Sequence, residues 1–476
     1  MTSFRCPALG LALLPLILAA APLRAQVAQE QAPQAQTEAP AEQSAPEDAA
    51  PAPAAMPEMP TDSPAEPPAA DQAAETPPSA EAPAPAMAEP AAPAEPPVPQ
   101  PALAAPVAPP APPPPVVAQP AAPAAPIAPK DVKLRIGSQG GAYMKSQELA
   151  YFQPFASRSG YGVTGLAFDG SLAALKAQAG SPAWDVVDLD QAVAIQACQQ
   201  GLLESLDASL AQPGPDGTPA AEDFLPGSIQ PCSIANVVWS ATIVYDKGLK
   251  TAPTKVENFF DLKRYPGKRA LPRTPQHTLE LALLGDGVAP DQVYPLLATR
   301  EGQDRAFAKL SAIKDQIVWW DRPRDGLDKI ALKQAAMGIG FNGRAFMAMV
   351  KSRQPIALLW DHQIYHLSYW AIPKDAKFAA AAREFIGFAT GAGPMSDQTR
   401  WLPYGPARLS AMRLVGKHAE LNLDMRPFLP THQPNLQGAL AYDSAWWAAQ
   451  EQPLKDRFTA WLEGRESAAS EPATSQ

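Results

Sequence analysis

Aromatic rings and ionisable side chains gather in residues 358–373 more densely than in any other stretch of this chain. The sixteen residues include two Trp, two Tyr, two His, one Asp and one Gln. A ring face attracts a cation and a carboxylate pairs with one. The stretch could therefore form the wall of a small-molecule site and then cross back to another lobe as a strand. It could equally be an amphipathic strand that buries its rings and exposes its polar groups, and the stretch alone leaves both alternatives open.

Two other stretches match known motifs only in part. Residues 338–343 fit the G-x-G-x-x-G dinucleotide pattern, but that motif needs its strand before the first glycine, and here the glycines lie within the predicted strand. Residues 362–366 resemble the zinc motif H-E-x-x-H, but Gln363 stands in place of the general-base Glu, and the neighbouring residues favour a strand or loop. We expect neither a cofactor nor a metal at these stretches. A G-x-S-x-G motif and convincingly paired carboxylates are also missing from the sequence, so we expect a protein that is not an enzyme.

The N-terminal part is predicted to be a secretory signal followed by a linker. Arg5 precedes an apolar run that Pro15 interrupts, and the small residue Ala25 suits cleavage. Residues 1–25 are therefore predicted to be a signal peptide that sends the protein to the periplasm, with a retained anchor as the alternative. Residues 26–130 hold 31 of the 58 prolines and are otherwise mostly Ala, Glu and Gln. Such a composition favours a disordered segment.

The charge divides at the same boundary. The chain has 38 basic and 48 acidic residues, of which 3 and 13 fall within residues 1–130, so the remainder has 35 of each and no net charge. A neutral folded part offers no electrostatic footprint for nucleic acid. The basic run at residues 263–269 is predicted to be a solvated turn, with a protein-docking patch as the second possibility.

Strand-like and helix-like stretches alternate from residue 131 onward. Strands are predicted at 132–136, 162–166, 184–189, 236–245, 266–271, 317–320 and 337–341, and helices at 146–155, 171–178, 278–284, 327–335, 344–351 and 379–388. This alternation indicates an α/β fold with a largely parallel sheet. Ligands of such sheets bind beyond the carboxyl ends of the strands, which predicts a crevice at Ala142, Tyr143, Asp169 and Ser171.

The order of the elements predicts two lobes and a hinge. The long strand at 236–245 enters a second alternating region, and residues 358–373 bring the chain back, so at least two strands would connect the lobes. Lobe 1 is predicted at about 131–238 and 371–412, lobe 2 at about 239–370, C-terminal helices at 413–465 and a disordered tail at 466–476.

Three cysteines are present, and export would leave two of them. Cleavage of the signal removes Cys6, and in an oxidising compartment Cys198 and Cys232 are expected to pair. The alternative is a catalytic thiol, which would need a His partner and a reducing compartment.

The ordered set of short motifs resembles the extracellular solute-binding proteins of bacterial ABC importers, specifically the spermidine/putrescine-binding family. The motifs lie at residues 140–143, 184–187, 201–204, 266–269, 341–346, 370–373 and 404–406. The resemblance implies two lobes of the type II periplasmic-binding-protein fold that close on a ligand, no catalysis, and delivery of the solute to a membrane permease.

Some positions depart from that family. Arg273 and His277 stand where the polyamine binders use carboxylates, and Phe341 stands where they use Trp. Despite these departures, the resemblance leads us to predict a polyamine-like amine as the ligand of a monomeric protein. An anionic or zwitterionic solute, or a sensor that uses the linker as a tether, is the alternative. The predicted ligand-binding residues are Ala142, Tyr143, Asp169, Ser171, Asp190, Trp239, Asn342, Trp360, Asp361, Gln363 and Tyr404, with Asp361 carrying the ligand's charge.

Overall fold

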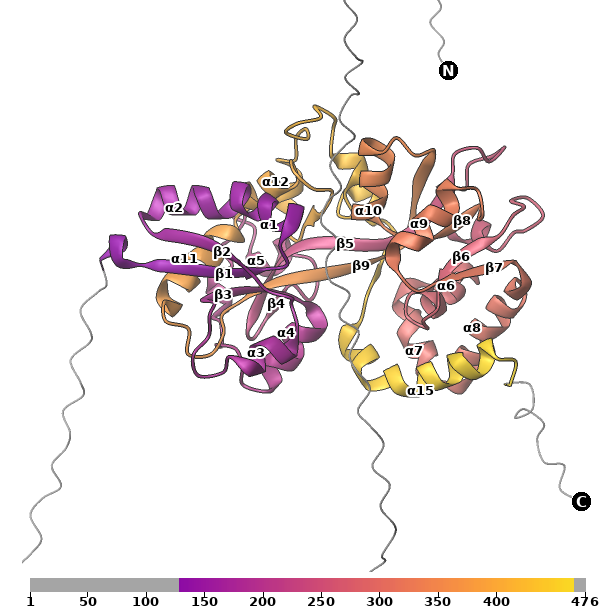
Figure 1. Ribbon diagram of the computed structural model, residues 1–476, viewed down its shortest axis with the longest axis horizontal. Coiled ribbons are helices and arrows are strands. Elements are labelled where there is room, and N and C mark those ends of the chain that lie inside the picture. The colour runs from indigo at the N-terminus through magenta and orange to yellow at the C-terminus, as the bar shows by residue number, and fades with distance from the viewer. Residues whose placement is uncertain (1–127, 466–476) are drawn as a thin grey trace, which may run out of the picture. The chain divides into compact units, whose positions relative to one another are not determined.

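The computed structural model describes residues 128–465, which form the two α/β lobes shown in Figure 1. The predicted signal peptide, nearly all of the predicted linker and the predicted tail lie outside the described residues. The predicted fold, two α/β lobes joined by a hinge of crossing strands, is confirmed within this part of the chain.

All eleven strands that the structure describes join one sheet, whose main path runs β2-β1-β3-β9-β5-β8-β6-β7. Lobe 1 holds β1 (Lys133–Ser138), β2 (Gly162–Ala167) and β3 (Val186–Asp190), and lobe 2 holds β6 (Arg269–Pro272), β7 (Ile317–Trp320) and β8 (Met337–Phe341). The strands pair in parallel within each of these sets. Parallel neighbours need crossover connections, and the intervening helices supply them.

Two long strands run from one lobe to the other. They are β5 (Ser233–Asp246) and β9 (Ile356–Ala371), which pair antiparallel along most of their length. In lobe 1, residues 368–371 of β9 pair with β3. In lobe 2, residues 241–245 of β5 pair with β8. Most of the aromatic-rich stretch 358–373 therefore belongs to β9, and it crosses between the lobes as predicted.

The helices of lobe 1 cover both faces of its half of the sheet. They are α1 (Gly141–Gln147), α2 (Gln153–Ser159), α3 (Leu172–Ala177), α4 (Gln191–Gln199), α5 (Ala220–Asp223), α11 (Ala379–Ala389), α12 (Ala392–Gln398) and α13 (Leu409–Met412). A π-helical turn, Glu148–Phe152, joins α1 to α2. Two short strands, β4 (Ile229–Gln230) and β10 (Gly405–Pro406), pair with β5.

Lobe 2 has its own set of helices. They are α6 (Thr278–Gly285), α7 (Val293–Leu297), α8 (Arg300–Ser311), α9 (Pro323–Ala331) and α10 (Asn342–Phe346), and a π-helical turn (Met347–Lys351) continues α10. The helix predicted at 327–335 is displaced towards the N-terminus. Pro323 occupies a first-turn position, where its missing N–H costs nothing, and Lys333, just beyond the helix, has a φ of 59° that no α-helix contains.

The C-terminal segment returns to the crossing strands. It contains α14 (Gln433–Leu436), β11 (Leu440–Ala441) and α15 (Ser444–Leu462), and β11 adds to β9 in parallel. In Figure 1, α15 lies along the lower edge of lobe 2, beside α7 and α8. Trp447, Phe458 and Trp461 on α15 are buried in the lobe 2 core, so they pack this helix against the rest of the lobe.

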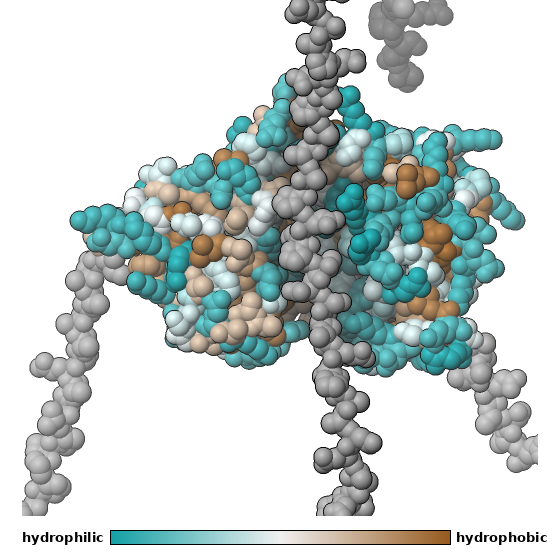
Figure 2. Space-filling view, viewed as in Figure 1, coloured by the Kyte–Doolittle hydropathy of each residue, from teal (hydrophilic) through white to brown (hydrophobic). Residues whose placement is uncertain are grey.

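Each lobe has its own hydrophobic core. One cluster centres on β1, β3 and the buried Trp370, and the other on α6, β8 and the C-terminal helix. The face in Figure 2 is largely hydrophilic, with scattered hydrophobic patches rather than one broad apolar surface. Among the helices that the structure describes, none has the length and apolar character of a membrane span.

Candidate functional site

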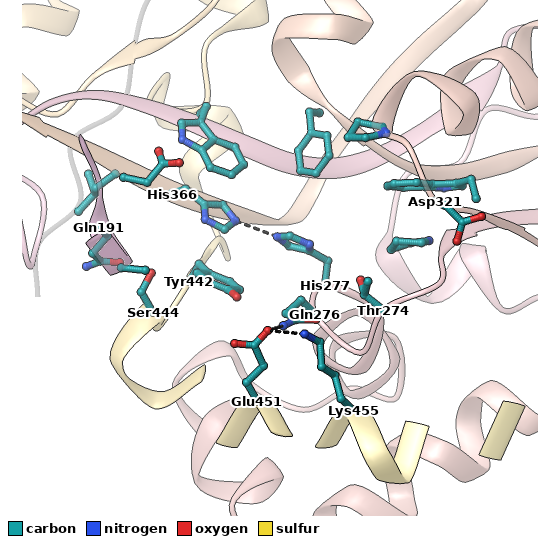
Figure 3. Close-up of a pocket in the computed structure, with 18 residues that line it drawn as sticks. Gln191, Thr274, Gln276, His277, Asp321, His366, Tyr442, Ser444, Glu451 and Lys455 are labelled. Atoms are coloured by element: carbon teal, nitrogen blue, oxygen red, sulfur yellow. Dashed lines mark hydrogen bonds and ion pairs between the residues drawn. The ribbon is translucent and has the colours of Figure 1, made fainter. Parts of the chain in front are cut away.

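The carboxyl ends of strands from both lobes converge on one cleft. Its volume is about 440 Å³. Lobe 1 contributes the end of β3 and the start of α4, and lobe 2 contributes the last residues of β6, β7 and β8 and the segments after β6 and β7. The lining consists of Asp190, Gln191, Ala192, Trp239, Pro272, Thr274, Gln276, His277, Trp320, Asp321, Pro323, Phe341, His366, Leu367, Tyr442, Ser444, Glu451 and Lys455. The ten of these that Figure 3 labels come from both lobes and from the C-terminal segment.

Stacked rings form the back wall of the cleft. The rings of Trp239 on β5 and His366 on β9 are parallel within 4°, with centroids 3.9 Å apart. Tyr442 covers the neighbouring space, 4.2 Å from His366 and 5.3 Å from His277. Because Trp239 and His366 are directly opposite in the β5–β9 ladder, the two crossing strands hold this stack in place.

The two histidines of this wall face each other. Their Nε2 atoms are 2.9 Å apart, so one donates a hydrogen bond to the other (Figure 3). Burial lowers the pKa of His277 to about 4, and burial together with the charge of His277 lowers the pKa of His366 well below its usual value. Both rings are therefore neutral at pH 7, and the wall presents aromatic faces without a positive charge.

Three carboxylates line the cleft, and two of them already have cationic partners. Asp321 pairs with Arg273 at 3.2 Å, and Glu451 pairs with Lys455 at 2.9 Å. Asp190 has no cationic partner among the described residues. Its Oδ1 accepts a hydrogen bond from Ser368 at 3.2 Å. Although Asp190 faces the open cleft, the protein atoms around it raise its pKa by desolvation, and hydrogen bonds from Ser368 and Trp239 partly offset this.

A pair of tyrosines lies near Asp190. The Tyr143 hydroxyl donates to Asp188 at 2.6 Å, and its ring meets the edge of Tyr404 with centroids 5.7 Å apart. Burial is the largest cause that raises the pKa of Tyr404, while the positive charge of Arg344 lowers that pKa and the negative charge of Asp190 raises it. A cation and an anion therefore both act on Tyr404, and no ion pair of Arg344 is formed within the described residues.

Gly343 makes room for this arrangement. A Cβ at position 343 would lie 2.8 Å from the Tyr404 ring, closer than any side chain allows. The start of α10 can therefore approach Tyr404 only because residue 343 is a glycine.

Of the eleven predicted binding residues, the structure places Asp190 and Trp239 in the cleft lining. Tyr143 and Tyr404 pack against each other, and the charge of Asp190 acts on Tyr404. These four residues are therefore brought close to one another, although they lie on four separate segments of the chain.

Four other predicted residues lie outside the cleft lining. Ala142 is exposed in the first turn of α1. Asp169 accepts a hydrogen bond from the Ser171 N–H, and Ser171 caps α3 by accepting one from the Ala174 N–H. Asn342 is buried, where it accepts from the Ser240 N–H at 2.9 Å and donates to the Pro403 carbonyl at 2.6 Å. The hydrogen bonds of Asp169, Ser171 and Asn342 are therefore with backbone groups and stabilise the local structure.

The three predicted residues from the stretch 358–373 also lie outside it. The Trp360 indole donates to the Pro427 carbonyl, and Gln363 is buried and donates to two backbone carbonyls. Asp361 accepts from the Val256 N–H at 2.7 Å and from His362 at 3.0 Å. The β5–β9 register shifts between the pairs Ala241/Ile364 and Ile243/Leu359, so residues 360–363 leave the regular ladder. A site that includes Asp361 therefore stays a prediction without support from the cleft geometry.

Several lining residues were absent from the predicted site. Asp321 and Phe341 follow or end predicted strands, so the strand-end rule could have found them. His366 lies in the aromatic-rich stretch 358–373, whose predicted binding residues are Trp360, Asp361 and Gln363. The sequence could not predict Glu451 and Lys455 as cleft residues, because it does not show against which element their helix packs.

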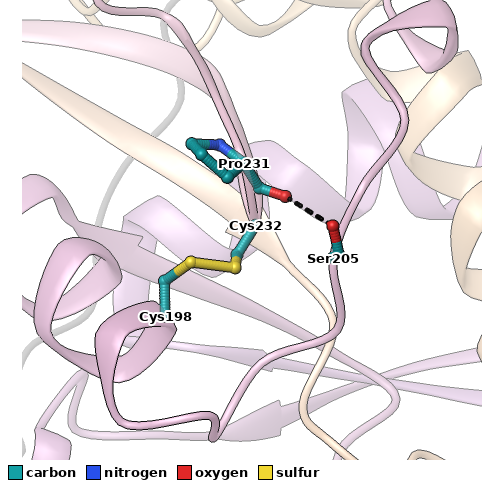
Figure 4. Close-up of a disulfide and its surroundings, with 4 residues drawn as sticks. All are labelled: Cys198, Ser205, Pro231 and Cys232. Carbon is teal, nitrogen blue, oxygen red and sulfur yellow. Dashed lines mark hydrogen bonds between the residues drawn. A yellow bond between two sulfur atoms is a disulfide. The ribbon is translucent and has the colours of Figure 1, made fainter.

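The predicted disulfide is confirmed. Cys198 at the end of α4 is bonded to Cys232, which directly precedes β5, with Cα atoms 5.8 Å apart (Figure 4). The bond ties the helix that follows Asp190 to the crossing strand that carries Trp239.

Within residues 128–465, no cluster of three or more His, Cys, Asp or Glu side chains could hold a metal ion. The cleft instead offers rings, one unpaired carboxylate and hydrogen-bonding groups. Such a set suits the reversible binding of a small polar molecule.

Comparison with known proteins agrees with this chemistry. Residues 150–420, more than half of the chain, match the family model described as bacterial extracellular solute-binding protein. The chain is 36% identical over 331 residues to a γ-aminobutyric acid-binding protein of Pseudomonas aeruginosa, with 69% of this chain and 90% of that protein covered.

Solved structures extend the comparison. A γ-aminobutyric acid receptor is 28% identical, with 69% of this chain and 97% of that chain covered and a TM-score of 0.56. A binding protein from A. tumefaciens R10 in complex with agropinic acid is also 28% identical, covers 70% and 99%, and has a TM-score of 0.52. An unliganded, open binding protein from Agrobacterium tumefaciens C58 is 22% identical and shares the fold, with a TM-score of 0.60 over 70% of this chain and all of that one.

The similarities and the two-lobed cleft point to the same class of protein. The relatives are binding components of transporters rather than enzymes. This chain therefore belongs to the bacterial extracellular solute-binding proteins, and it is the non-enzymatic component that binds a small solute for an ABC transporter.

Proposed function

We propose that this protein captures a small zwitterionic amine of the γ-aminobutyric acid class and delivers it to the permease of an ABC importer. Such a ligand carries one ammonium group and one carboxylate on a short carbon chain. The single observation that carries the proposal is the pairing of charges in the cleft. Asp321 and Glu451 are neutralised by Arg273 and Lys455, which leaves Asp190 alone to bind an ammonium group.

One unpaired carboxylate suits a monoamine better than a diamine. Each ammonium group that leaves water needs an ionic partner, or its desolvation costs several kcal/mol. The ring faces of Trp239 and Tyr442 would support the single ammonium beside Asp190 by cation–π attraction. The neutral state of His277 and His366 is favourable to a cation, since two imidazolium groups would repel it.

Arg344 is the proposed partner of the ligand carboxylate. It is exposed at the start of α10, its charge reaches Tyr404, and it forms no ion pair with any described residue. A guanidinium binds a carboxylate through two parallel hydrogen bonds. A zwitterion bound between Asp190 on lobe 1 and Arg344 on lobe 2 would join the two lobes. The names of the relatives that bind γ-aminobutyric acid support the same ligand class.

A polyamine remains the second candidate, because three carboxylates line the cleft against one lysine. Putrescine could bind if a conformational change released Asp321 or Glu451 from its partner. A periplasmic location, export by the N-terminal signal and a monomeric state belong to the same proposal.

Three four-carbon compounds test the ligand class by calorimetry. γ-Aminobutyric acid has both charges, putrescine has two ammonium groups, and butyrate lacks the amine. We expect γ-aminobutyric acid to bind much more tightly than the other two. Asp190→Asn and Arg344→Gln should each weaken its binding by about 10- to 100-fold, the loss of roughly 1.5–3 kcal/mol expected for a hydrogen bond to a charged group. Tighter binding of putrescine than of γ-aminobutyric acid would favour the second candidate.

A further inference from the structure

A carboxyl group lies in the lobe 2 core directly behind the cleft. Glu280, on the first turn of α6, is fully buried. Its Oε1 accepts a hydrogen bond from the Trp447 indole at 2.6 Å and one from the Tyr294 hydroxyl at 3.4 Å. Its Oε2 is buried and has no hydrogen-bond partner among the described residues. A polar group in this situation is costly, and the residue does not line the cleft.

The two hydrogen-bond partners of Glu280, Trp447 and Tyr294, contact the segment that places Tyr442 in the cleft. Trp447 stands on α15, five residues after Tyr442, and the two rings are stacked within 10°. The Tyr294 hydroxyl in turn accepts a hydrogen bond from the N–H of Asp443. Through these two contacts, Glu280 fixes the segment that presses Tyr442 against His366.

Glu280 also lies three residues after His277. His277 is the N-cap residue of α6 and has a φ of 63°, a left-handed conformation that is uncommon for histidine. Such backbone strain persists only where the surroundings hold it. Glu280 stands on the first turn of the helix that His277 begins, so both lie in the same short segment behind the cleft.

We propose that Glu280 is a positioning residue for ligand capture, which holds Tyr442 in the cleft through Trp447 and Tyr294 and couples its placement to its own protonation state. An ionised carboxylate accepts hydrogen bonds that are shorter and stronger than those of the neutral acid. The ionised form should therefore hold the wall more firmly, and affinity should rise with pH as Glu280 loses its proton.

The charged surroundings of Glu280 leave it free to titrate near neutral pH. Burial raises its pKa to about 7, and the hydrogen bonds from Trp447 and Tyr294 offset this in part. The ionisable groups on the packed elements include His277 and Asp286 on or beside α6, Tyr294 on α7, Arg300, Glu301, Asp304, Arg305 and Lys309 on α8, Glu257 in the turn 256–259, and Tyr442, Asp443, Glu451, Lys455, Asp456 and Arg457 in the C-terminal segment. Arg457 pairs with Asp304. Arg305 and Lys309 pair with Asp286, Arg300 pairs with Asp304, and Lys455 pairs with Glu451. These cations are therefore engaged by other carboxylates.

Glu280→Gln is the matched variant, because it keeps the shape and the accepting oxygen and cannot titrate. We would measure the affinity for γ-aminobutyric acid from pH 5.5 to 8.5 in both full-length proteins. The affinity of wild type should increase severalfold as pH rises through about 7. The affinity of Glu280→Gln should increase less over the same range. Asp188 in lobe 1, whose pKa burial also raises to about 7, is common to both proteins, so the difference between the two profiles isolates Glu280. Identical profiles would overturn the proposal.

A second measurement needs no ligand. The indole N–H resonance of Trp447, assigned by its loss in Trp447→Phe, should shift with pH in ligand-free wild type with a midpoint near neutral pH. It should not show this step in Glu280→Gln. A resonance that is flat in wild type overturns the proposal whatever the ligand is. The binding arm rests on the proposed function, so a shifting resonance without any binding of γ-aminobutyric acid would reject that ligand and keep Glu280 as a titrating anchor of Trp447. If Glu280→Gln does not fold, Tyr294→Phe removes one donor and should raise the midpoint, and an unchanged midpoint would count against the proposal.

Discussion

At the scale of single residues, the cleft combines one carboxylate that has no cationic partner among the described residues with a wall of uncharged rings. Asp190 is open to the ligand, whereas His277 and His366 are held unprotonated by burial. Both histidines have lower pKa values in the folded protein than in the unfolded chain. Protons at acid pH therefore bind the unfolded chain more readily and favour unfolding. The stability of the protein must therefore depend on pH.

His277→Asn tests this dependence. Asn tolerates a positive φ better than most residues, so the variant keeps the backbone and removes one titrating ring. A histidine with a lowered folded-state pKa gives stability that is full above the unfolded pKa of about 6.5 and is lost as pH falls towards the folded value of about 4. The melting temperature of wild type should therefore fall relative to that of the variant between pH 6.5 and pH 4. Buried Glu280 and Asp188 act in the opposite direction in both proteins, so only the difference between the two melting curves is informative. A difference that does not change with pH would mean that His277 is protonated in the folded state.

Asp361→Asn distinguishes a structural carboxylate from a binding one. Asp361 joins the backbone of Val256 to β9 and pairs with His362, outside the cleft. The substitution should lower stability by roughly 1 kcal/mol and leave the affinity for the ligand unchanged. Asp190→Asn should do the reverse, with weaker binding and an unchanged or higher melting temperature. Thermal melts and calorimetry on the two variants check both expectations, and a loss of affinity in Asp361→Asn would return that residue to the site.

The sequence could predict the binding residues only where they lie on or at the end of a clearly patterned strand. Asp190 and Trp239 lie on strands that hydrophobic runs reveal, and the carboxyl-end rule applies to Asp190 directly. The rings that surround Asp361 in the sequence predict a binding residue there, which the cleft geometry does not support. The register shift in β9 and the φ of 54° at His362 turn that part of the strand away from regular alternation. Such an irregularity depends on how β9 pairs with β5, so it could not be predicted from the sequence of β9 alone.

At the scale of elements, the strands and most helices could be predicted because their hydrophobic periods are clear. The predicted strand at 317–320 has the same bounds as β7, and the strand at 337–341 the same bounds as β8. The path of the C-terminal segment could not be predicted, since β11 is two residues long and α15 contains Pro453 in its interior. This segment nevertheless supplies Tyr442 to the cleft.

The disulfide gives a test at this scale. The bond between Cys198 and Cys232 closes a loop whose ends are 34 residues apart in the sequence and joins α4 to the residue before β5. In the chain-entropy model a loop of this size contributes roughly 3–4 kcal/mol. Replacing both cysteines by serine should therefore lower the melting temperature by several degrees, more than a Ser→Ala change at the exposed Ser205. Because the bond also ties α4 to the strand of Trp239, a modest loss of affinity should accompany it. An unchanged melting temperature would show that native contacts alone fix α4 against β5.

At the scale of the whole molecule, the described residues form two hydrophobic cores that two long strands connect. Each lobe has its own core, and β5 and β9 pass from one core to the other. The proposed ligand contacts fall on both sides, with Asp190 on lobe 1 and Arg344 on lobe 2. A ligand can shift a conformational equilibrium only through contacts that differ between the states, and contacts with both lobes are of this kind.

Closure on the ligand can be measured across the cleft in the full chain. Lys145 on α1 and Arg324 at the start of α9 have 59% and 83% exposed side chains and stand on opposite lobes. Spin labels on Lys145→Cys and Arg324→Cys, with the native disulfide kept intact, report the distance between the lobes. Saturating γ-aminobutyric acid should shorten this distance and narrow its distribution, because a zwitterion held between Asp190 and Arg344 favours the arrangement in which both contacts form. In the Asp190→Asn background the same ligand concentration should leave the ligand-free distribution in place. If calorimetry shows binding to the labelled protein while the distance stays constant, the crossing strands do not act as a hinge for this ligand.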